Sequence, residues 1–225
     1  MKTILITGGS SGIGEACARA AITAGHRVAL TARTKSSLKA LVDELGSRAI
    51  AVPCDVTKWK EQQQMFAAVE DAFERIDVVF ANAGVGSSAS GTEAGDPDDF
   101  SRMVTTNCLG LTYTAKLAIP YLKRTRGHFV VTGSQAGVNV LRGSVYGATK
   151  WFVNGYARNL AAELDGTRVR VTNLQPGMVD TPFFDAPKPQ ALRPRDVAKA
   201  FMYVIGQPEN VDVASLLIRP TPEAS

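Results

Sequence analysis

Short apolar runs alternate with longer amphipathic patterns along the whole chain, and this alternation limits the possible folds more than any other feature. Seven runs are rich in Val, Ile, Leu and Phe, which is typical of strands buried on both faces; they cover residues 3–7, 27–31, 48–52, 76–80, 127–132, 168–174 and 214–218. Helical patterns separate them, near residues 13–24, 36–45, 58–74, 98–122, 145–165 and 195–206. Strand–helix alternation predicts a doubly wound α/β fold, with a seven-stranded parallel sheet and helices on both faces.

The length favours a single domain. The 225 residues fit one α/β unit, and no internal repeat, low-complexity tract or linker divides them. The only proline-rich stretch runs from Pro182 to Pro194, directly after the sixth predicted strand. We therefore predict one domain over residues 1–225, with a short substrate lid at about 181–194.

Charge and composition argue against several classes of partner. The net charge is only +4, and the densest basic run is Lys123, Arg124 and Arg126. It is read either as an anion patch or as cations that offset the dipole at a helix end. No aromatic residues are interleaved with it for base stacking, which favours the second reading and no nucleic-acid partner. No run of about 18 apolar residues occurs, so no membrane span is expected.

The cysteines and histidines indicate neither disulfides nor a metal site. The three cysteines are scattered without a CxxC spacing, which favours reduced thiols and a cytoplasmic protein. His26 and His128 are far apart in the chain, and each is expected at the surface between a helix and a strand.

A glycine-rich turn follows the first predicted strand, and a helix follows the turn. Its sequence runs from Thr7 to Gly14 with a G-x-x-x-G-x-G spacing, which differs from the G-x-G-x-x-G dinucleotide fingerprint. Glycines let the backbone approach a pyrophosphate closely, and the helix N-terminus offers free N–H groups to it. A turn without a ligand is the alternative reading.

The end of the second strand indicates which nicotinamide cofactor fits. Sites for NAD place an acidic residue here to bind the ribose 2′-hydroxyl, but this chain has Ala32 followed by Arg33. An arginine pairs well with a 2′-phosphate, and Ser10 or Ser11 can donate to the same group. We therefore predict NADP(H); the alternative reading of Arg33 is a solvated loop residue.

Small and polar residues end the next two strands. Asp55 and Val56 follow the third strand, and Asn82, Ala83 and Gly84 follow the fourth. Ligands of doubly wound sheets bind outside these carboxyl ends, where Asp55 can accept a hydrogen bond from an adenine amino group. Taken singly, each of these residues also suits a turn.

The fifth strand leads toward residues suited to proton transfer. Ser134 follows it, and Tyr146 and Lys150 share one face of the next helix at i and i+4. Free tyrosine has a pKa of about 10, and a nearby ammonium lowers it toward neutrality. Ser134 can hydrogen-bond a substrate oxygen on which charge develops. Alone, the Tyr-x-x-x-Lys spacing would describe an ordinary helix face.

Together these motifs resemble the short-chain dehydrogenase/reductase family in its compact, NADP-preferring form, over nearly the whole chain. The resemblance rests on motifs in the family's order: Thr7-Gly8, Gly12-Ile13-Gly14, Asp55, Asn82-Ala83-Gly84, Asn107, Ser134, Tyr146, Lys150, Pro176-Gly177 and Thr181. It implies a Rossmann-like fold and an oxidoreductase that moves a hydride between nicotinamide and a carbonyl or secondary alcohol carbon.

The resemblance also implies residue roles. Tyr146 exchanges the proton, and Ser134 orients and stabilises the oxygen. Lys150 binds the nicotinamide ribose and tunes Tyr146, while Asn107 holds a water that links Lys150 to solvent. Further cofactor contacts are implied along the loop after the sixth strand: Pro176, Gly177, Val179 and Thr181.

The substrate is less constrained. Lining residues expected beside Ser134 and Tyr146 include Gln135, Met178 and Phe183. The pocket is expected to be mostly apolar with no carboxylate clamp, which favours a small or medium carbonyl compound. Two alternatives are an NADP(H)-sensing protein without turnover and a dehydrogenase of small 3-hydroxy acids. Apolar residues on several faces of the helices near 98–122 and 145–165, with the resemblance, suggest a homodimer or homotetramer.

Overall fold

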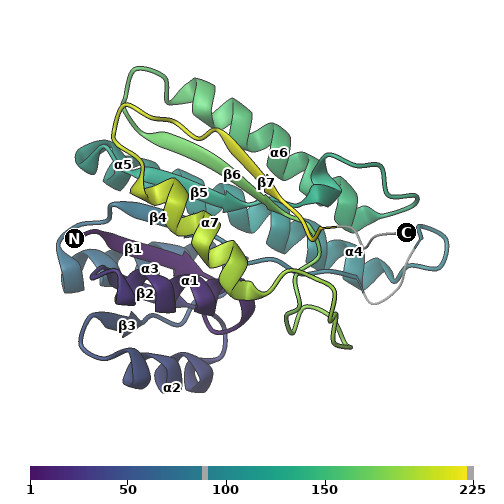
Figure 1. Cartoon of the computed structure of the whole chain (residues 1–225), viewed down its shortest axis with the longest axis horizontal. Helices are drawn as coiled ribbons and strands as arrows, with labels where there is room; N and C mark the ends of the chain where they lie inside the picture. Colours follow the sequence, from purple (N-terminus) through teal and green to yellow (C-terminus); the bar gives the residue numbers. More distant parts are fainter. Residues whose placement is uncertain (88–90, 222–225) are drawn as a thin grey trace.

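The computed structural model describes residues 1–87 and 91–221 and is built around one sheet. All seven strands are parallel, in the order β3-β2-β1-β4-β5-β6-β7 (Figure 1), so the prediction of a seven-stranded parallel sheet is confirmed. The strands are β1 Thr3–Thr7, β2 Arg27–Thr31, β3 Ala49–Ala51, β4 Val78–Ala81, β5 His128–Thr132, β6 Arg170–Pro176 and β7 Ser215–Ile218.

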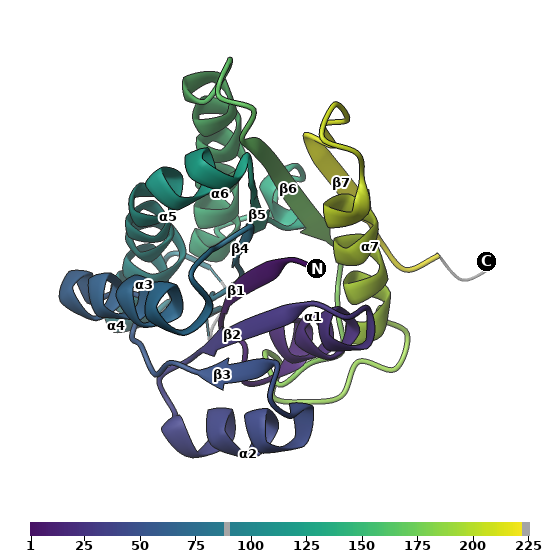
Figure 2. The ribbon, with the colours of Figure 1, turned by 90° about the vertical axis from the view of Figure 1, so that its left-hand side faces the viewer.

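Helices cover both faces of the sheet, as predicted. The α-helices are α1 Gly12–Thr23, α2 Lys35–Leu45, α3 Trp59–Phe73, α4 Pro97–Val104, α5 Leu111–Thr125, α6 Val145–Glu163 and α7 Pro194–Gly206. Figure 2 shows α1, α2 and α7 on one face and α3, α5 and α6 on the other. Each face has its own apolar core. In one core the Phe80 ring stacks on the Phe201 ring, with centroids 4.6 Å apart, and in the other Phe66 and Phe129 are buried.

The helix expected over residues 98–122 is interrupted. It consists of α4, a π-helical segment η1 over Thr105–Gly110, and α5. Helix α4 begins where the sequence favours a start, because the Asp96 side chain accepts a hydrogen bond from Asp98 N (2.9 Å) and Pro97 follows it. The π segment has no comparable signature in the sequence.

The sixth strand begins later than expected. The apolar pattern predicted a strand over 168–174, whereas β6 spans Arg170–Pro176. Arg168 has φ of 65°, a left-handed conformation that an extended strand cannot include. The shift carries β6 two residues further, to Pro176 beside the candidate site.

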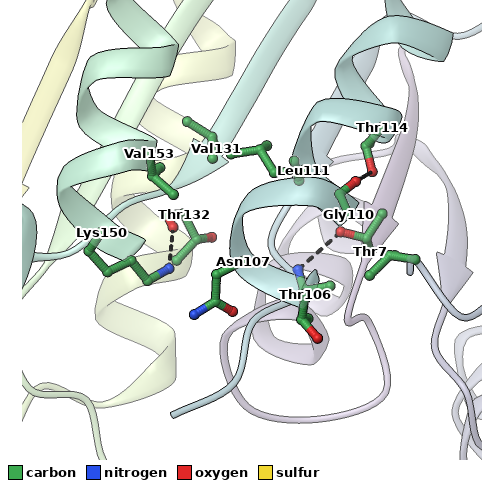
Figure 3. A pocket seen from close by; sticks show the side chains of 13 residues that line it. Thr7, Thr106, Asn107, Gly110, Leu111, Thr114, Val131, Thr132, Lys150 and Val153 are labelled. Carbon is green, nitrogen blue, oxygen red and sulfur yellow. Dashed lines mark hydrogen bonds between the residues drawn. The ribbon is translucent and has the colours of Figure 1, made fainter. Parts of the chain in front are cut away.

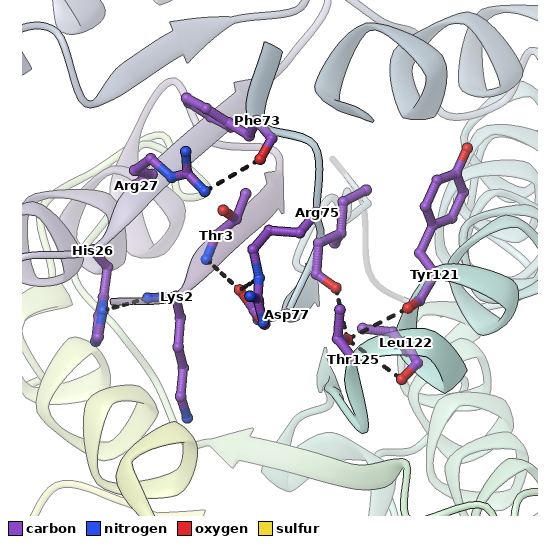
Figure 4. A network of polar contacts seen from close by, with 11 residues as sticks. Lys2, Thr3, His26, Arg27, Phe73, Arg75, Asp77, Tyr121, Leu122 and Thr125 are labelled. Atoms are coloured by element: carbon purple, nitrogen blue, oxygen red, sulfur yellow. Dashed lines mark hydrogen bonds and ion pairs between the residues drawn. The ribbon is translucent and has the colours of Figure 1, made fainter. Parts of the chain in front are cut away.

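Polar contacts join the amino ends of the strands, at the edge opposite the glycine-rich turn (Figure 4). Asp77 accepts a hydrogen bond from Thr3 N (2.8 Å) and forms an ion pair with Arg75. The expectation that His128 lies at the surface is wrong, since the residue is only 1% exposed. It is the first residue of β5, and its Nε2 lies 2.7 Å from Thr172 Oγ1 on the neighbouring β6.

Over residues 1–87 and 91–221, no helix combines the length and apolar character needed to cross a bilayer. The same residues contain no group of three or more His, Cys, Asp or Glu side chains placed to hold a metal ion. Cys17 and Cys54 are buried free thiols, and Cys108 is a half-buried one.

Candidate active site

The glycine-rich turn is closely packed at the carboxyl end of β1. Gly8 and Gly12 have φ of 64° and 55°, which favour glycine. A Cβ on Gly14 would lie 2.2 Å from Gly8 O, so no larger residue fits there without a shift of the backbone. Ser11 has an extended backbone and precedes α1, whose first N–H groups have no partner within the helix. The turn therefore has the form of an anion-binding cradle.

A partly buried network fixes this turn against two neighbouring strands. Thr7 Oγ1 accepts hydrogen bonds from Asn82 N and Ala83 N, both at 3.0 Å. The Asn82 amide donates to Thr7 O and Gly8 O (3.1 Å each), and its oxygen accepts from Thr132 Oγ1 (3.0 Å). Asn82 was predicted to let the cofactor pass close to its backbone; its side chain holds β1, β4 and β5 together.

Two further predicted cofactor residues lie on loops at the same edge. Arg33 is exposed, and its guanidinium forms no ion pair with any residue that the structure describes. Asp55 Oδ1 accepts hydrogen bonds from Thr57 N (2.9 Å) and Thr57 Oγ1 (2.8 Å), which leaves Oδ2 without a partner among the described residues. Both side chains thus retain the groups through which they were predicted to bind.

The loop after β6 returns to the glycine-rich turn. A Cβ on Gly12 would lie 3.2 Å from Thr181 Cγ2, so two predicted cofactor residues from opposite ends of the chain are in contact. The base of the predicted lid is closed by a bridge between Val179 and Leu192. Asp180 adds an ion pair with Arg193 (2.7 Å).

Ser134 and Tyr146 are brought together as predicted. Ser134 Oγ accepts a hydrogen bond from Ala136 N (3.0 Å), which leaves its hydroxyl hydrogen available for Tyr146. Burial raises the pKa of the Tyr146 phenol, and the hydrogen bond with Ser134 acts in the opposite direction. The sequence predicted a lowered pKa from the neighbouring ammonium; here burial outweighs the other influences on the phenol.

Lys150 lies beneath the same tyrosine. Its Nζ is 5.7 Å from the centroid of the Tyr146 ring and donates a hydrogen bond to Thr132 O (2.8 Å). Burial lowers the pKa of Lys150 to about 8, and Cys108 has a smaller opposing effect. The position of the ammonium is thus fixed by the Thr132 carbonyl at the end of β5 as well as by helix α6.

Asn107 lies in the π segment and is 2% exposed. Its Oδ1 accepts a hydrogen bond from Val85 N and its Nδ2 donates to Val85 O, both at 2.9 Å. The same Nδ2 donates to Thr149 Oγ1 at 3.0 Å. Through Asn107, these three contacts link the loop after β4 to helix α6.

A small cavity separates Asn107 and Lys150 from the end of β1 (Figure 3). The residues that line it are Thr7, Val56, Ala81, Ala83, Thr106, Asn107, Gly110, Leu111, Thr114, Val131, Thr132, Lys150 and Val153. Val56, predicted near the cofactor, therefore faces the rear of the site. Gly110 packs closely against Val56, since a Cβ on Gly110 would lie 3.1 Å from Val56 Cγ2.

Phe183 covers Tyr146 from the lid. The two ring centroids are 5.5 Å apart, and a Cβ on Gly86 would lie 2.6 Å from Phe183 Cζ. Met178, also predicted near the substrate, is 51% exposed. Of the residues predicted to meet the substrate, Phe183 therefore makes the clearest contact with Tyr146.

Sequence reasoning missed three residues that shape the site: Thr132, Thr149 and Gly86. Thr149 stands directly before Lys150, but its helical pattern gives no sign of a contact with Asn107. For Thr132, the sequence did contain one signal, namely its position at the end of a strand. Thr132 ends a buried strand with a hydroxyl, as Thr7 does, and a buried hydroxyl requires a partner.

The family model described as short chain dehydrogenase matches residues 2–191. The chain is 35% identical to an uncharacterized oxidoreductase of Staphylococcus aureus, over 97% of each chain. It is 32% identical to an NADP-dependent 3-hydroxy acid dehydrogenase of Salmonella typhi, over 98% of this chain and 96% of the other.

Solved structures agree with the fold. The closed form of a serine dehydrogenase complexed with NADP+ is 31% identical, with a TM-score of 0.91 over 99% of this chain and 97% of the other. An alcohol dehydrogenase from the archaeon Thermococcus sibiricus, complexed with 5-hydroxy-NADP, is 33% identical, with a TM-score of 0.91 over 100% of both chains. With the glycine-rich turn and the residues around Tyr146, these matches show that the chain belongs to the short-chain dehydrogenase family.

Proposed function

We propose that the protein is an NADP(H)-dependent oxidoreductase acting on a small-to-medium carbonyl compound or the corresponding secondary alcohol. The observation that carries the proposal is the arrangement around the Tyr146 phenol, where Ser134 acts on the phenol pKa and Lys150 Nζ lies 5.7 Å from the centroid of the same ring. A phenol held between a hydroxyl and an ammonium is suited to exchange a proton with a substrate oxygen.

The choice of NADP(H) rests on the adenosine side of the predicted cofactor site. Gly8, Gly12 and Gly14 form a cradle that side chains would fill, and Arg33 has no ion-pair partner among the described residues. The dehydrogenase of Salmonella typhi is NADP-dependent, and the serine dehydrogenase is complexed with NADP+. When bound, the cofactor supplies or accepts the hydride.

The chain's own residues supply the acid–base chemistry. Tyr146 donates its proton to the carbonyl oxygen during reduction and receives one during oxidation. Ser134 holds that oxygen beside the phenol, where its negative charge grows. Lys150 binds the nicotinamide ribose, and Asn107 fixes the loop of Val85 and holds a water behind Lys150.

Substitution of Tyr146 by Phe tests the acid–base role. We expect kcat for ketone reduction to fall by about 10²- to 10⁴-fold, because the proton donor is lost, while NADPH affinity is unchanged. Initial rates read from NADPH absorbance and a binding titration measure both. Tyr156→Phe, on the same helix, is the matched control. Full activity of Tyr146→Phe would refute the role, and tight NADPH binding without turnover of any carbonyl by the unaltered protein would indicate a sensing protein instead.

Substitution of Arg33 by Ala tests the cofactor preference. We expect KM for NADPH to rise about tenfold or more, since a charge-assisted hydrogen bond to the 2′-phosphate is lost, and KM for NADH to stay the same. Arg48→Ala, on the turn before β3, serves as the control. A preference of the unaltered protein for NADH would contradict this assignment.

We further propose that the protein forms a homodimer or homotetramer. Large apolar side chains are 40–50% exposed on neighbouring parts of α4, η1 and α6: Val104, Leu109, Trp151 and Phe152. Their burial against a second copy would remove this surface from water. A monomer in a light-scattering measurement at assay concentration would contradict the proposal.

A further inference from the structure

Gln135 and Arg219 meet beside Gly177, at the carboxyl ends of β6 and β7. A Cβ on Gly177 would lie 3.0 Å from Gln135 Oε1 and 3.2 Å from the Cβ of Arg219. Gln135 directly follows Ser134, and Arg219 directly follows β7. The Gln135 amide oxygen and the base of the Arg219 side chain thus meet at Gly177, although they come from distant parts of the sequence.

Neither side chain is used within the fold. The Gln135 amide and the Arg219 guanidinium form no hydrogen bond or ion pair with any residue in the ranges 1–87 and 91–221. Gln135 is half-buried, whereas Arg219 is exposed. By contrast, Arg193, directly before α7, is paired with Asp180. The two groups therefore offer N–H donors and a positive charge to a molecule bound at the site.

The strand order gives the site two chemically different sides. Ser134 follows β5, which lies between β4 and β6. On the side of β4, the Phe183 ring lies against Gly86 and Tyr146. On the side of β6 and β7 stand Gln135 and Arg219. A substrate whose carbonyl reaches Ser134 and Tyr146 would have an apolar wall on one side and the unpaired donors on the other.

We propose that Arg219, assisted by the Gln135 amide, binds a carboxylate of the substrate, so that the substrate class is short oxo acids and their hydroxy acids. This inference rests on the proposed oxidoreductase function and specifies its substrate. The planar guanidinium matches a carboxylate with two parallel N–H donors, and an amide N–H can serve the remaining lone pairs.

The carboxylate takes no part in the reaction itself. The carbonyl carbon gains the hydride from NADPH and its oxygen gains the proton of Tyr146, which yields the hydroxy acid and NADP+. Arg219 therefore acts on binding, and its loss is expected to raise KM more than it lowers kcat. The pocket was expected to have no carboxylate clamp, because Arg219 is remote from Ser134 along the chain and only the sheet brings the ends of their strands to the same side.

The kinetic test compares acetoacetate with ethyl acetoacetate, which has the same ketone without the charge. With NADPH, the unaltered protein is expected to have the higher kcat/KM for acetoacetate. Arg219→Met is expected to lower that value about tenfold or more, through KM, and to leave the ester unchanged. Arg48→Met is the control for loss of a positive charge elsewhere. Equal losses on acid and ester, or a preference of the unaltered protein for the ester, would overturn the proposal.

A binding test separates this proposal from the proposed reaction. Calorimetric titration of 3-hydroxybutyrate into NADP+-saturated Tyr146→Phe is expected to give about tenfold tighter binding than into the Tyr146→Phe, Arg219→Met double variant. Equal affinities would refute the carboxylate site even if ketone esters are reduced in a Tyr146-dependent manner. Arg219-dependent binding without reduction of any ketone would instead keep the site and refute the proposed reaction.

Discussion

Thr149 connects two of the residues around which the site is built. Its hydroxyl donates a hydrogen bond to Tyr146 O (2.7 Å) and accepts one from Asn107 Nδ2 (3.0 Å), and the residue is only 3% exposed. Because the single hydroxyl hydrogen is used by Tyr146 O, the Asn107 amide must present its N–H side to Thr149. Thr149 thus fixes the orientation of Asn107 and the first turn of α6 together.

Substitution of Thr149 by Val keeps the shape of the side chain and removes both hydrogen bonds. We expect kcat to fall about tenfold, because the buried Asn107 amide loses a partner and Tyr146 is held less closely to Ser134. Since the Ser134 hydrogen bond acts to lower the pKa of Tyr146, the limb of the pH–rate profile that reports the phenol is expected to move to higher pH.

Thr149→Ser retains the hydroxyl and is the matched control, with rates and pH dependence close to those of the unaltered protein. Normal pH dependence of Thr149→Val, with only reduced thermal stability, would show that the residue is purely structural.

Single residues differ in how far the sequence predicted their positions. Ser134 and Tyr146 were expected together, because Ser134 follows the end of a buried strand, Tyr146 lies in the first turn of the next helix, and the family resemblance gives both a role in one reaction. The bonding of Asn82 was not expected, because its partners Thr7 and Thr132 lie on strands that only the tertiary fold brings beside it. The direction of the Tyr146 pKa shift also depends on burial, which helical spacing does not report.

Among the larger elements, the loop between β6 and α7, which contains the predicted lid, contacts Tyr146 through Phe183. Phe183 reaches across to the loop after β4, where Gly86 leaves room for the ring. Phe184 packs edge-on against Phe183, with centroids 5.2 Å apart. The absence of a side chain at Gly86 therefore determines how closely the Phe183 ring approaches Tyr146.

Substitution of Gly86 by Ala is expected to force the Phe183 ring toward Tyr146, because the added Cβ would lie 2.6 Å from Phe183 Cζ. We expect kcat/KM for a bulky ketone to fall about fivefold or more relative to a small one. In a Phe183→Ala background the same substitution is expected to have no effect, which a double-mutant cycle measures. Gly155→Ala, where no atom lies within 4 Å, is the control. An unchanged size preference in Gly86→Ala would contradict the argument.

The helices and strands were predictable where one pattern spans the whole element. Apolar runs in β1 and β2 predicted those strands over the residues that form them, Thr3–Thr7 and Arg27–Thr31. The π segment escaped prediction because apolar periodicity continues from α4 through Thr105–Gly110 into α5. Its carbonyl at Gly110 is satisfied by Gln62 Nε2 (3.0 Å), a contact with another helix that local sequence does not encode.

For the molecule as a whole, the two ends of the parallel strands have different roles. The predicted reacting groups gather at the carboxyl ends of the strands, and the opposite edge contains polar groups that stabilise the fold. His128 is among them: its Nε2 lies against Thr172 Oγ1, and its Nδ1 is buried without a hydrogen-bond partner among the described residues. Burial, with smaller effects from Arg170 and Lys2, lowers the pKa of His128 to about 3.

This histidine makes stability depend on pH. Between pH 6.5 and about 3 the unfolded chain binds a proton at His128 and the folded chain does not, so acid favours unfolding in this window and has no such effect above it. We expect His128 to account for a loss of about 2 kcal/mol between pH 7 and pH 5. Urea unfolding at both pH values should show this loss to be absent in His128→Leu. An identical pH dependence in the two proteins would contradict the assignment.

The interrupted helix between α4 and α5 also has a geometric consequence. Each residue turns an α-helix by about 100°, so a wider π turn shifts the angular phase between the helix before it and the helix after it. The side chains of α4 and α5 therefore do not follow one continuous helical phase, although the chain runs from one helix to the other without a loop. Asn107 lies in the π segment that causes this change of phase. Deletion of one residue there, which would restore regular α-helical winding, would rotate the Asn107 amide away from Val85. The alignment of that amide is thus encoded by the count of residues between two helices as much as by the asparagine itself.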